Sequence, residues 1–394
     1  MPANLPAMPQ ARILVVDDIA DNRDLLVRRL RRDGYCEIAT AEDGNAALAL
    51  LGERDFDLVL LDLMMPRCDG YEVLERMGES AGLRDVPVIM LSADGELDSV
   101  VRCIKLGAVD YLQKPFNPVL LRARVSATLE KKRLRDEAQR HLARLEQDLD
   151  AGRKLQLAMV PTEFPEPTPE RPVEVSARME AAREVGGDLY DVFTADDGKL
   201  CFLIGDVSGK GVASALFMAR TKTLLRTIAG MSRENGGAAS AGEIVSRVNR
   251  ELCQDNDTMM FVTLFFGVLN GLTGQLEFCN AGHDAPFLIR QDGLDRVNGT
   301  RAMALGVMDG IDYPTDRLEV ATGESLFLFT DGITEATDAA GDMFTETRLA
   351  PVLSDNAAAR PAALVNAVTE AVAHFVGDTR PSDDITALAL RHLG

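Results

Sequence analysis

The chain has 394 residues, of which 46% are hydrophobic and 26% charged, and its formal net charge is −20. This is the composition of a folded globular protein, and the length predicts two domains or more. The acidic balance argues against nucleic acid as the main ligand. No apolar run reaches the length of a membrane-spanning helix.

The first residues, MPANLPAMPQ, have neither the basic region nor the apolar core of a signal peptide. We predict a disordered tail over residues 1–10 and a cytoplasmic protein. The six cysteines are scattered without a CxxC pair, which is typical of small core residues in a reducing compartment. With four histidines and no HExxH motif, a zinc site is not expected.

Residues 11–125 alternate between strand and helix patterns. Apolar stretches such as RILVVDD, DLVLLD and VPVIMLS are separated by helical stretches such as DNRDLLVRRLRRDG. This alternation predicts an α/β flavodoxin-like domain, with a five-stranded parallel sheet covered on both faces. Ligand sites of such sheets lie at the carboxyl ends of strands. The polar residues expected there are Asp17, Asp18, Asp62, Ser92 and Lys114.

This set of residues resembles the receiver domain of bacterial response regulators. The resemblance implies that Asp62 accepts a phosphoryl group from a cognate histidine kinase, and that Ser92 and Lys114 contact the phosphoryl oxygens. Tyr111 stands where that family has its switch aromatic residue. The resemblance also implies a Mg²⁺ site formed by Asp17 (through water), Asp18, Asp62 and the backbone carbonyl of Met64. The alternative is a flavodoxin-like domain whose acids only cap strand ends.

Residues 126–160 form the next predicted region, a long helical linker rich in charge that ends before the prolines of FPEPTPERP. Ala138, Leu142, Leu145 and Leu149 have the a/d spacing of a coiled coil. A polar helix with one apolar seam needs a partner to cover that seam. A homodimer is therefore expected. The alternative is that the helix packs against the chain's own C-terminal domain.

Residues 165–393 have grouped strands and separate helices, which predict an α+β domain with sheets in the middle and helices outside. Acidic residues recur at the ends of the predicted strands. Several converging carboxylates would repel one another and raise their pKa values unless cations lay between them. The pattern therefore predicts a two-metal site that activates a water molecule. The acids concerned are Asp188, Asp206, Asp331, Asp383 and Asp384.

The stretches REVGGDLYD, GDVSGKGVASAL, NAGHDAP, LFLFTDGITEA and SDDITAL resemble, in this order, the SpoIIE or RsbU branch of the PP2C phosphatases. The resemblance implies two Mn²⁺ or Mg²⁺ ions. Their implied ligands are Asp206 and the carbonyl of Val207, which bridge both ions, Asp331 and Asp383 on the second ion, and Asp188 through ordered water. Asp384 is expected to orient its neighbours, and Arg183 is not assigned a phosphate-binding role.

Together these patterns predict a phosphorylation-controlled response regulator whose output is hydrolysis of phosphoserine or phosphothreonine on a protein. In the resembling branch the substrate is a phosphorylated STAS-domain anti-sigma factor antagonist, in partner-switching control of a sigma factor. Two alternatives stay open: a catalytically silent fold that sequesters a partner, and a hydrolase of a small phosphoester. His283 is either a general acid or a turn histidine held by hydrogen bonds.

Overall fold

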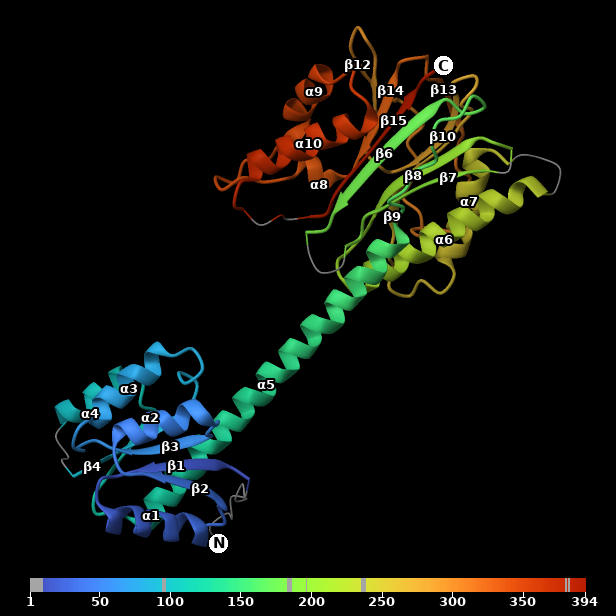
Figure 1. Ribbon diagram of the computed structural model, residues 1–394. Coiled ribbons are helices and arrows are strands. Elements are labelled where there is room, and N and C mark those ends of the chain that lie inside the picture. Colours follow the sequence, from blue (N-terminus) through green and yellow to red (C-terminus); the bar gives the residue numbers. More distant parts are fainter. Residues whose placement is uncertain are drawn as a thin grey trace. The chain divides into compact units, whose positions relative to one another are not determined.

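Figure 1 shows the computed structural model of the protein, which describes residues 10–93, 97–182, 186–195, 197–234, 239–379, 381 and 383–394. Of the tail predicted over residues 1–10, all but Gln10 lies outside the described residues, as does Arg183. Contacts divide the chain into two compact units, Met1–Arg144 and Leu145–Gly394. None of the described helices is both long enough and apolar enough to cross a membrane.

The first unit contains a five-stranded sheet in the order β2-β1-β3-β4-β5, and every neighbouring pair is parallel. The predicted parallel sheet is thus confirmed. β3 and β4 are buried along their whole length, which explains their continuous apolar sequences. The strands are β1 Arg12–Val16, β2 Glu37–Ala41, β3 Leu58–Asp62, β4 Val88–Ser92 and β5 Asp110–Gln113.

Helices cover both faces of this sheet. One core joins the sheet to α1 (Ala20–Arg32) and to the first turns of α5, through Leu121, Val125 and Leu129. The core on the other face includes residues of α2 (Gly44–Glu53), α3 (Gly70–Glu79) and α4 (Leu97–Lys105). The long helix expected after the sheet is α5 (Pro118–Met159), which begins in the first unit and ends in the second.

The second unit contains two five-stranded antiparallel sheets, in the orders β13-β10-β9-β8-β7 and β12-β11-β14-β15-β6. The strands of the first are β7 Leu189–Thr194, β8 Leu200–Val207, β9 Val262–Leu269, β10 Gln275–Ala281 and β13 Asp316–Glu319. The strands of the second are β6 Val173–Glu180, β11 Phe287–Ile289, β12 Leu294–Arg296, β14 Ser325–Phe329 and β15 Ile385–His392.

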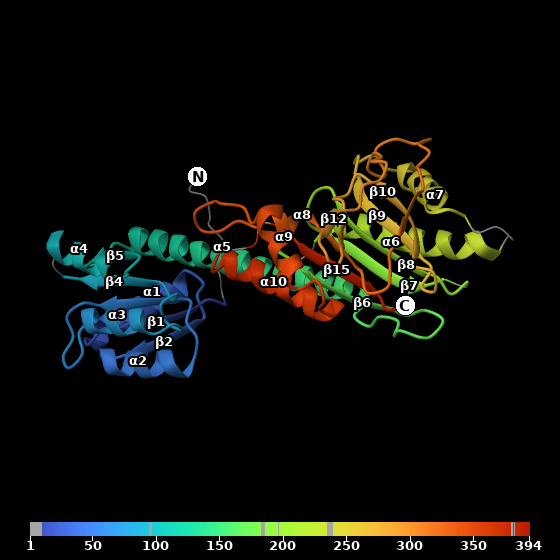
Figure 2. The same ribbon diagram turned by 90° about the horizontal axis from the view of Figure 1, so that it is seen from above.

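The two sheets pack face to face and helices cover their outer faces, as Figure 2 shows. α6 (Val212–Glu234) and α7 (Ala241–Cys253) lie on the sheet that holds β8. The short α8 (Asp331–Thr334), α9 (Thr345–Asp355) and α10 (Pro361–Val376) pack against the sheet that holds β14. The predicted α+β sandwich is confirmed, with sheets in the middle and helices outside.

The core between the sheets is built around stacked phenylalanines. The ring centroids of Phe202 and Phe265 lie 6.3 Å apart, and those of Phe265 and Phe278 lie 5.2 Å apart. Gly267 of β9 lies directly against this stack, because a Cβ atom there would come within 2.4 Å of Phe202 Cζ. The ring occupies the space that any side chain at position 267 would need.

We therefore predict that Gly267→Ala destabilises the second unit by about 1–3 kcal/mol, the usual cost of overpacking a core. Gly230→Ala is the matched control, since an added Cβ in that turn of α6 meets nothing within 4 Å. It should stabilise the protein by roughly 0.5–1 kcal/mol through helix propensity. Hydrogen exchange of the β9 amides measures both effects, and equal protection in the two variants would contradict the packing argument.

Candidate functional site

The first unit gathers its polar residues at the carboxyl edge of the sheet. Asp17 and Asp18 follow β1, and Asp62 is the last residue of β3, the neighbouring strand. Ser92 ends β4 with its side chain buried, and Lys114 follows β5. Because these four strands are adjacent and parallel, their carboxyl ends meet along one edge.

Three carboxylates converge at this edge. One oxygen from each of Asp17, Asp18 and Asp62 lies within 4.8 Å of the other two, which occurs nowhere else in the described part of the chain. Lys114 Nζ lies 2.7 Å from an oxygen of Asp17 and 2.7 Å from one of Asp62. Asn22 Nδ2 donates to Asp17 at 3.1 Å. The ammonium group of Lys114 thus pairs with two of the three acids.

Burial raises the pKa of Asp62, although the hydrogen bond from Lys114 opposes that rise. Burial alone would lower the pKa of Lys114, but its hydrogen bonds to Asp17 and Asp62 outweigh burial and raise it. Carboxylate oxygens with this excess of negative charge are the ligands that Mg²⁺ prefers. The donor set therefore fits the expected ion, and Met64 lies on the loop just beyond β3, where its carbonyl could join.

Tyr111 lies on β5, paired with Met90 of β4, and is half-buried. It is two strands from Asp62 and is not among the groups that contact the acids in the described structure. Ser92 and Lys114 are connected through the backbone, since Lys114 N donates to Ser92 O at 2.7 Å. The sequence-predicted residues of the first unit thus share one edge, with Tyr111 at its margin.

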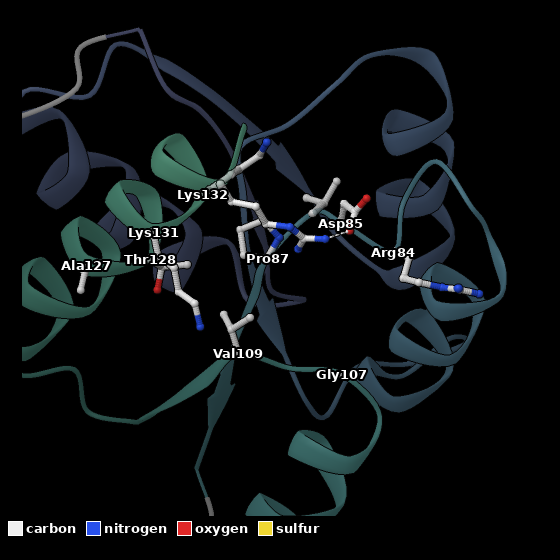
Figure 3. Close-up of a pocket in the computed structure, with 11 residues that line it drawn as sticks. Arg84, Asp85, Pro87, Gly107, Val109, Ala127, Thr128, Lys131 and Lys132 are labelled. Carbon is white, nitrogen blue, oxygen red and sulfur yellow. Dashed lines mark hydrogen bonds and ion pairs between the residues drawn. The ribbon is translucent and has the colours of Figure 1, made fainter. Parts of the chain in front are cut away.

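A hollow of about 240 Å³ lies at the opposite edge of this sheet (Figure 3). Pro87 and Val109, which precede β4 and β5, form its floor, and Lys131 of α5 points into it. Asp85 and Arg135, which also line it, form an ion pair. Because it borders the amino ends of the strands, this hollow is separate from Asp62 and belongs to the attachment of α5 to the sheet.

The second unit brings its acids together from both sheets. Asp206 lies near the end of β8, and Asp188 precedes β7, the strand paired with it. Asp331 begins α8 directly after β14, and Asp383 precedes β15. β14 and β15 are antiparallel, so the end of one meets the start of the other, and Thr330 N donates to Thr386 O at 3.1 Å.

Asp188 is held by two hydroxyl groups that sequence reasoning missed. Its Oδ2 accepts hydrogen bonds from Thr330 Oγ1 at 2.7 Å and from Thr386 Oγ1 at 2.5 Å. These bonds connect the start of β7 in one sheet to β14 and β15 in the other. The one available sequence signal was that both threonines stand within three residues of a predicted metal-binding acid.

The backbone at Gly187 lies directly against Asp206. A Cβ atom at Gly187 would come within 2.7 Å of the Val207 carbonyl oxygen and 3.0 Å of Asp206 Oδ1. The carboxylate of Asp384 accepts hydrogen bonds from Gly187 N at 2.8 Å and from Ala182 N at 2.9 Å. Asp384 thus contacts the backbone at Gly187, beside Asp206, and its orienting role remains a prediction.

Burial, and then nearby negative charge, raise the pKa values of Asp206 and Asp331. Burial and then the charges of Asp331, Asp383 and Asp384 raise the pKa of Asp206 to about 7. Burial and nearby acids, including Asp383, also raise the pKa of Asp331. Lys210 Nζ, 2.8 Å from Asp383 Oδ2, is the cation that the sequence analysis left out. Carboxylate and carbonyl oxygens are the ligands that divalent cations prefer, but in the described structure no three of these acids lie within 4.8 Å of one another as those of the first unit do.

His283 is held on both ring nitrogens. Nε2 lies 3.1 Å from the carbonyl oxygen of Phe329, so Nε2 carries the proton, and Thr263 Oγ1 lies 2.9 Å from Nδ1. Burial lowers the pKa of His283 to about 4. The ring is therefore neutral near pH 7 and has no proton free to give, which favours the turn histidine over the general acid.

Gln156, near the end of α5, is a further residue that sequence reasoning missed. Its side chain is buried; Nε2 donates to Gly186 O at 2.7 Å, and Oε1 accepts from Gly186 N at 3.1 Å. Gly186 precedes the loop that borders Asp206. The last turns of α5 are thus hydrogen-bonded to the backbone next to the candidate metal centre.

Comparison with known proteins agrees with both units. A family model described as "Response regulator receiver domain" matches residues 13–126, and one described as "Stage II sporulation protein E (SpoIIE)" matches residues 196–393. The SiaA-PP2C domain of Pseudomonas aeruginosa has the same fold as the second unit: the TM-score is 0.54 at 21% identity, over 64% of this chain and 98% of that domain.

Two relatives are similar in sequence. Protein IcfG of Synechocystis sp. is 32% identical over 264 residues, which is 62% of this chain and 41% of IcfG. The probable transcriptional regulator ycf27 of Guillardia theta is 43% identical over 118 residues, 30% of this chain and 45% of that protein. The chain thus spans less than half the length of either relative. Because the SpoIIE match extends over half of its 394 residues, the protein belongs to the SpoIIE family, and its N-terminal part is a response regulator receiver domain.

Proposed function

We propose that this protein is a response regulator whose output is metal-dependent hydrolysis of phosphoserine or phosphothreonine on a protein. The observation that carries the proposal is the convergence of Asp206, Asp331 and Asp383 at one edge of the sandwich, where their repulsion calls for divalent cations. The membership of the SpoIIE family supports the same reaction. None of the expected metal-binding acids is missing, which argues against a catalytically silent sequestering module.

In this proposal two Mn²⁺ or Mg²⁺ ions are held by Asp206, the Val207 carbonyl, Asp331 and Asp383, with Asp188 acting through water. The bound ions supply Lewis-acid activation of a water molecule for in-line attack on phosphorus. Thr330 and Thr386 keep the Asp188 carboxylate aimed at the site. Lys210, beside Asp383, adds positive charge where the phosphoryl group would lie.

The receiver unit is proposed to control this output. A carboxylate oxygen of Asp62 attacks the phosphorus of a phosphohistidine on the cognate kinase, so that a P–O bond forms while the P–N bond breaks. A Mg²⁺ ion held by Asp17, Asp18, Asp62 and the Met64 carbonyl supplies charge neutralisation. Lys114 lies 2.7 Å from Asp62 and, together with Ser92, stabilises the transferred phosphoryl group. Tyr111 is the proposed switch residue, whose side chain responds to the phosphorylation of Asp62.

For the substrate we propose a phosphorylated STAS-domain anti-sigma factor antagonist in the cytoplasm, in partner-switching control of a sigma factor. This assignment comes from the resemblance to the SpoIIE or RsbU branch. We also propose a homodimer formed through α5, because Leu142 and Leu145 of the predicted seam are each more than half exposed on that helix. Covering this apolar seam would stabilise a pair of helices.

The metal requirement gives the first test of the proposed reaction. Asp206→Asn should lower turnover of p-nitrophenyl phosphate at least about 100-fold, because it removes the shared ligand of both ions. Chelation should do the same to the wild type, and Mn²⁺ should restore it. Asp292→Asn, on the exposed turn between β11 and β12, is the matched control. Near-normal turnover by purified, folded Asp206→Asn protein would remove the two-metal proposal.

Phosphorylation of the receiver is tested separately. Acetyl phosphate with Mg²⁺ should label the wild type with an acid-stable, base-labile acyl phosphate, and Asp62→Asn should abolish the label while basal phosphatase activity survives. Asp24→Asn, on the exposed face of α1, should label normally. Intact-mass spectrometry reads the outcome, and a labelled Asp62→Asn protein would show that another residue is the acceptor.

Coupling between the two units is proposed to run through α5 to Gln156. A flexible Gly-Ser insertion after Gln147 should remove the effect of Asp62 phosphorylation on turnover, expected at about 5–150-fold, because a flexible segment cannot transmit a change in helix position. An inserted helical heptad keeps the seam in register and is the matched control. If the Gly-Ser variant responds as the wild type does, α5 is not the transmitter.

A further inference from the structure

A group of large apolar side chains is exposed beside the acids of the second unit. Met259 is 82% exposed and Leu216 is 67% exposed, and four others are exposed to lesser degrees. We name these six residues the apolar rim: Val212, Leu216, Met259, Phe261, Val307 and Met308. They come from the start of α6, from the loop before β9 and from the loop before β13. Exposed apolar side chains grouped on neighbouring segments can mark a contact with another molecule.

Hydrogen bonds hold these three segments together. Asn256 Nδ2 donates to Met260 O at 2.7 Å and to Gly306 O at 3.0 Å, which joins the two loops. Asn249 of α7 donates to Met308 O at 2.8 Å. A Cβ atom on Gly306 would lie 3.2 Å from Phe217 Cζ, so the second loop also borders α6. The apolar rim is therefore a built surface and not a set of independent loops.

The backbone of Met259 adopts an energetically unfavourable conformation. Its φ is +51°, in the left-handed region where a side chain other than glycine is unfavourable. The hydrogen bond from Met259 N to Asn256 O, 3.0 Å long, stabilises this conformation. Packing does not explain it, since the side chain is almost fully exposed. Strain that the fold maintains without a packing benefit points to function.

The apolar rim is continuous with the candidate metal centre. Ser208, two residues after Asp206, accepts at Oγ from Phe261 N at 3.0 Å, and Ser208 N donates to Phe261 O at 2.8 Å. Lys210, in the same turn, is paired with Asp383 at 2.8 Å. When the phosphorylated side chain of a protein substrate lies at these acids, the substrate surface around that side chain lies next to Phe261 and the start of α6.

We propose that the apolar rim docks the substrate, and that the substrate is a folded phosphoprotein with an exposed apolar surface next to its phosphorylated residue. This proposal rests on the proposed phosphatase function and adds the surface that binds the protein substrate. A small phosphoester would reach the acids without touching Met259 or Leu216. Flexible, polarisable methionines at positions 259 and 308 are suited to adapt to such a protein surface.

Two variants separate docking from catalysis. Met259→Gly removes the side chain and relieves the positive φ, so its folding stability should be kept or raised. Leu216→Gln keeps a good helix former on the exposed face of α6. Leu272→Gln is the matched control, an exposed leucine beyond the other end of β9. Each protein is assayed on p-nitrophenyl phosphate and on intact serine-phosphorylated STAS-domain proteins of the same genome.

Docking predicts that KM for the phosphoprotein rises at least about tenfold in Met259→Gly and Leu216→Gln. Turnover of p-nitrophenyl phosphate should stay within about twofold of wild type in both, because no metal-binding acid is touched. Leu272→Gln should match wild type on both substrates. Oligomeric state, measured by light scattering at the assay concentration, should be the same for all four proteins.

Other outcomes overturn the proposal. A parallel loss on p-nitrophenyl phosphate would mean that the apolar rim supports the acids, and a changed oligomeric state would mean that a second copy covers it. Unchanged kinetics on the phosphoprotein would remove docking while leaving the phosphatase function standing. Wild-type protein that hydrolyses p-nitrophenyl phosphate but no intact phosphoprotein would overturn both the docking surface and the protein-phosphatase proposal.

Discussion

Repulsion between carboxylates at the ends of buried strands is the constraint on which the rest of this protein depends. In the first unit Asp17, Asp18 and Asp62 lie together, and Lys114 pairs with Asp17 and Asp62. In the second unit burial and then the charges of Asp331 and Asp383 raise the pKa of Asp206, and Lys210 lies beside Asp383. Such arrangements are stable near neutral pH when cations or protons offset the charge. The two units therefore share one electrostatic design on two different folds.

Neutral hydrogen bonds hold the crowded acids of the second unit in place. Thr330 and Thr386 donate to Asp188, and backbone amides donate to Asp384. Hydroxyl and amide donors orient a carboxylate without supplying a full positive charge, so the site keeps its attraction for cations. The sandwich core behind them, with its stacked phenylalanines, limits how far the strand ends can move apart.

The helix α5 contributes residues to both units. Its first turns, with Leu121 and Val125, are part of the receiver core, while Gln156 near its end binds the backbone of Gly186. A rearrangement of the receiver that moved this helix would change the contact at Gly186, next to the loop that borders Asp206. These two attachments, in the receiver core and at Gly186, are what supports the proposed coupling through α5.

The local sequence pattern was enough to predict the parallel sheet, the sandwich and the acids at strand ends. These features depend on a few neighbouring residues: the apolar periodicity of each strand, and the position of Asp62 or Asp331 after an apolar run. The tertiary structure alone decided which distant groups meet those acids. Thr386 and Asp188 are separated by 198 residues and Gln156 and Gly186 by 30, and the loops of the apolar rim join through Asn256 and Gly306, 50 residues apart. Such pairs depend on strand register and on packing between sheets and helices, which no single stretch of sequence encodes.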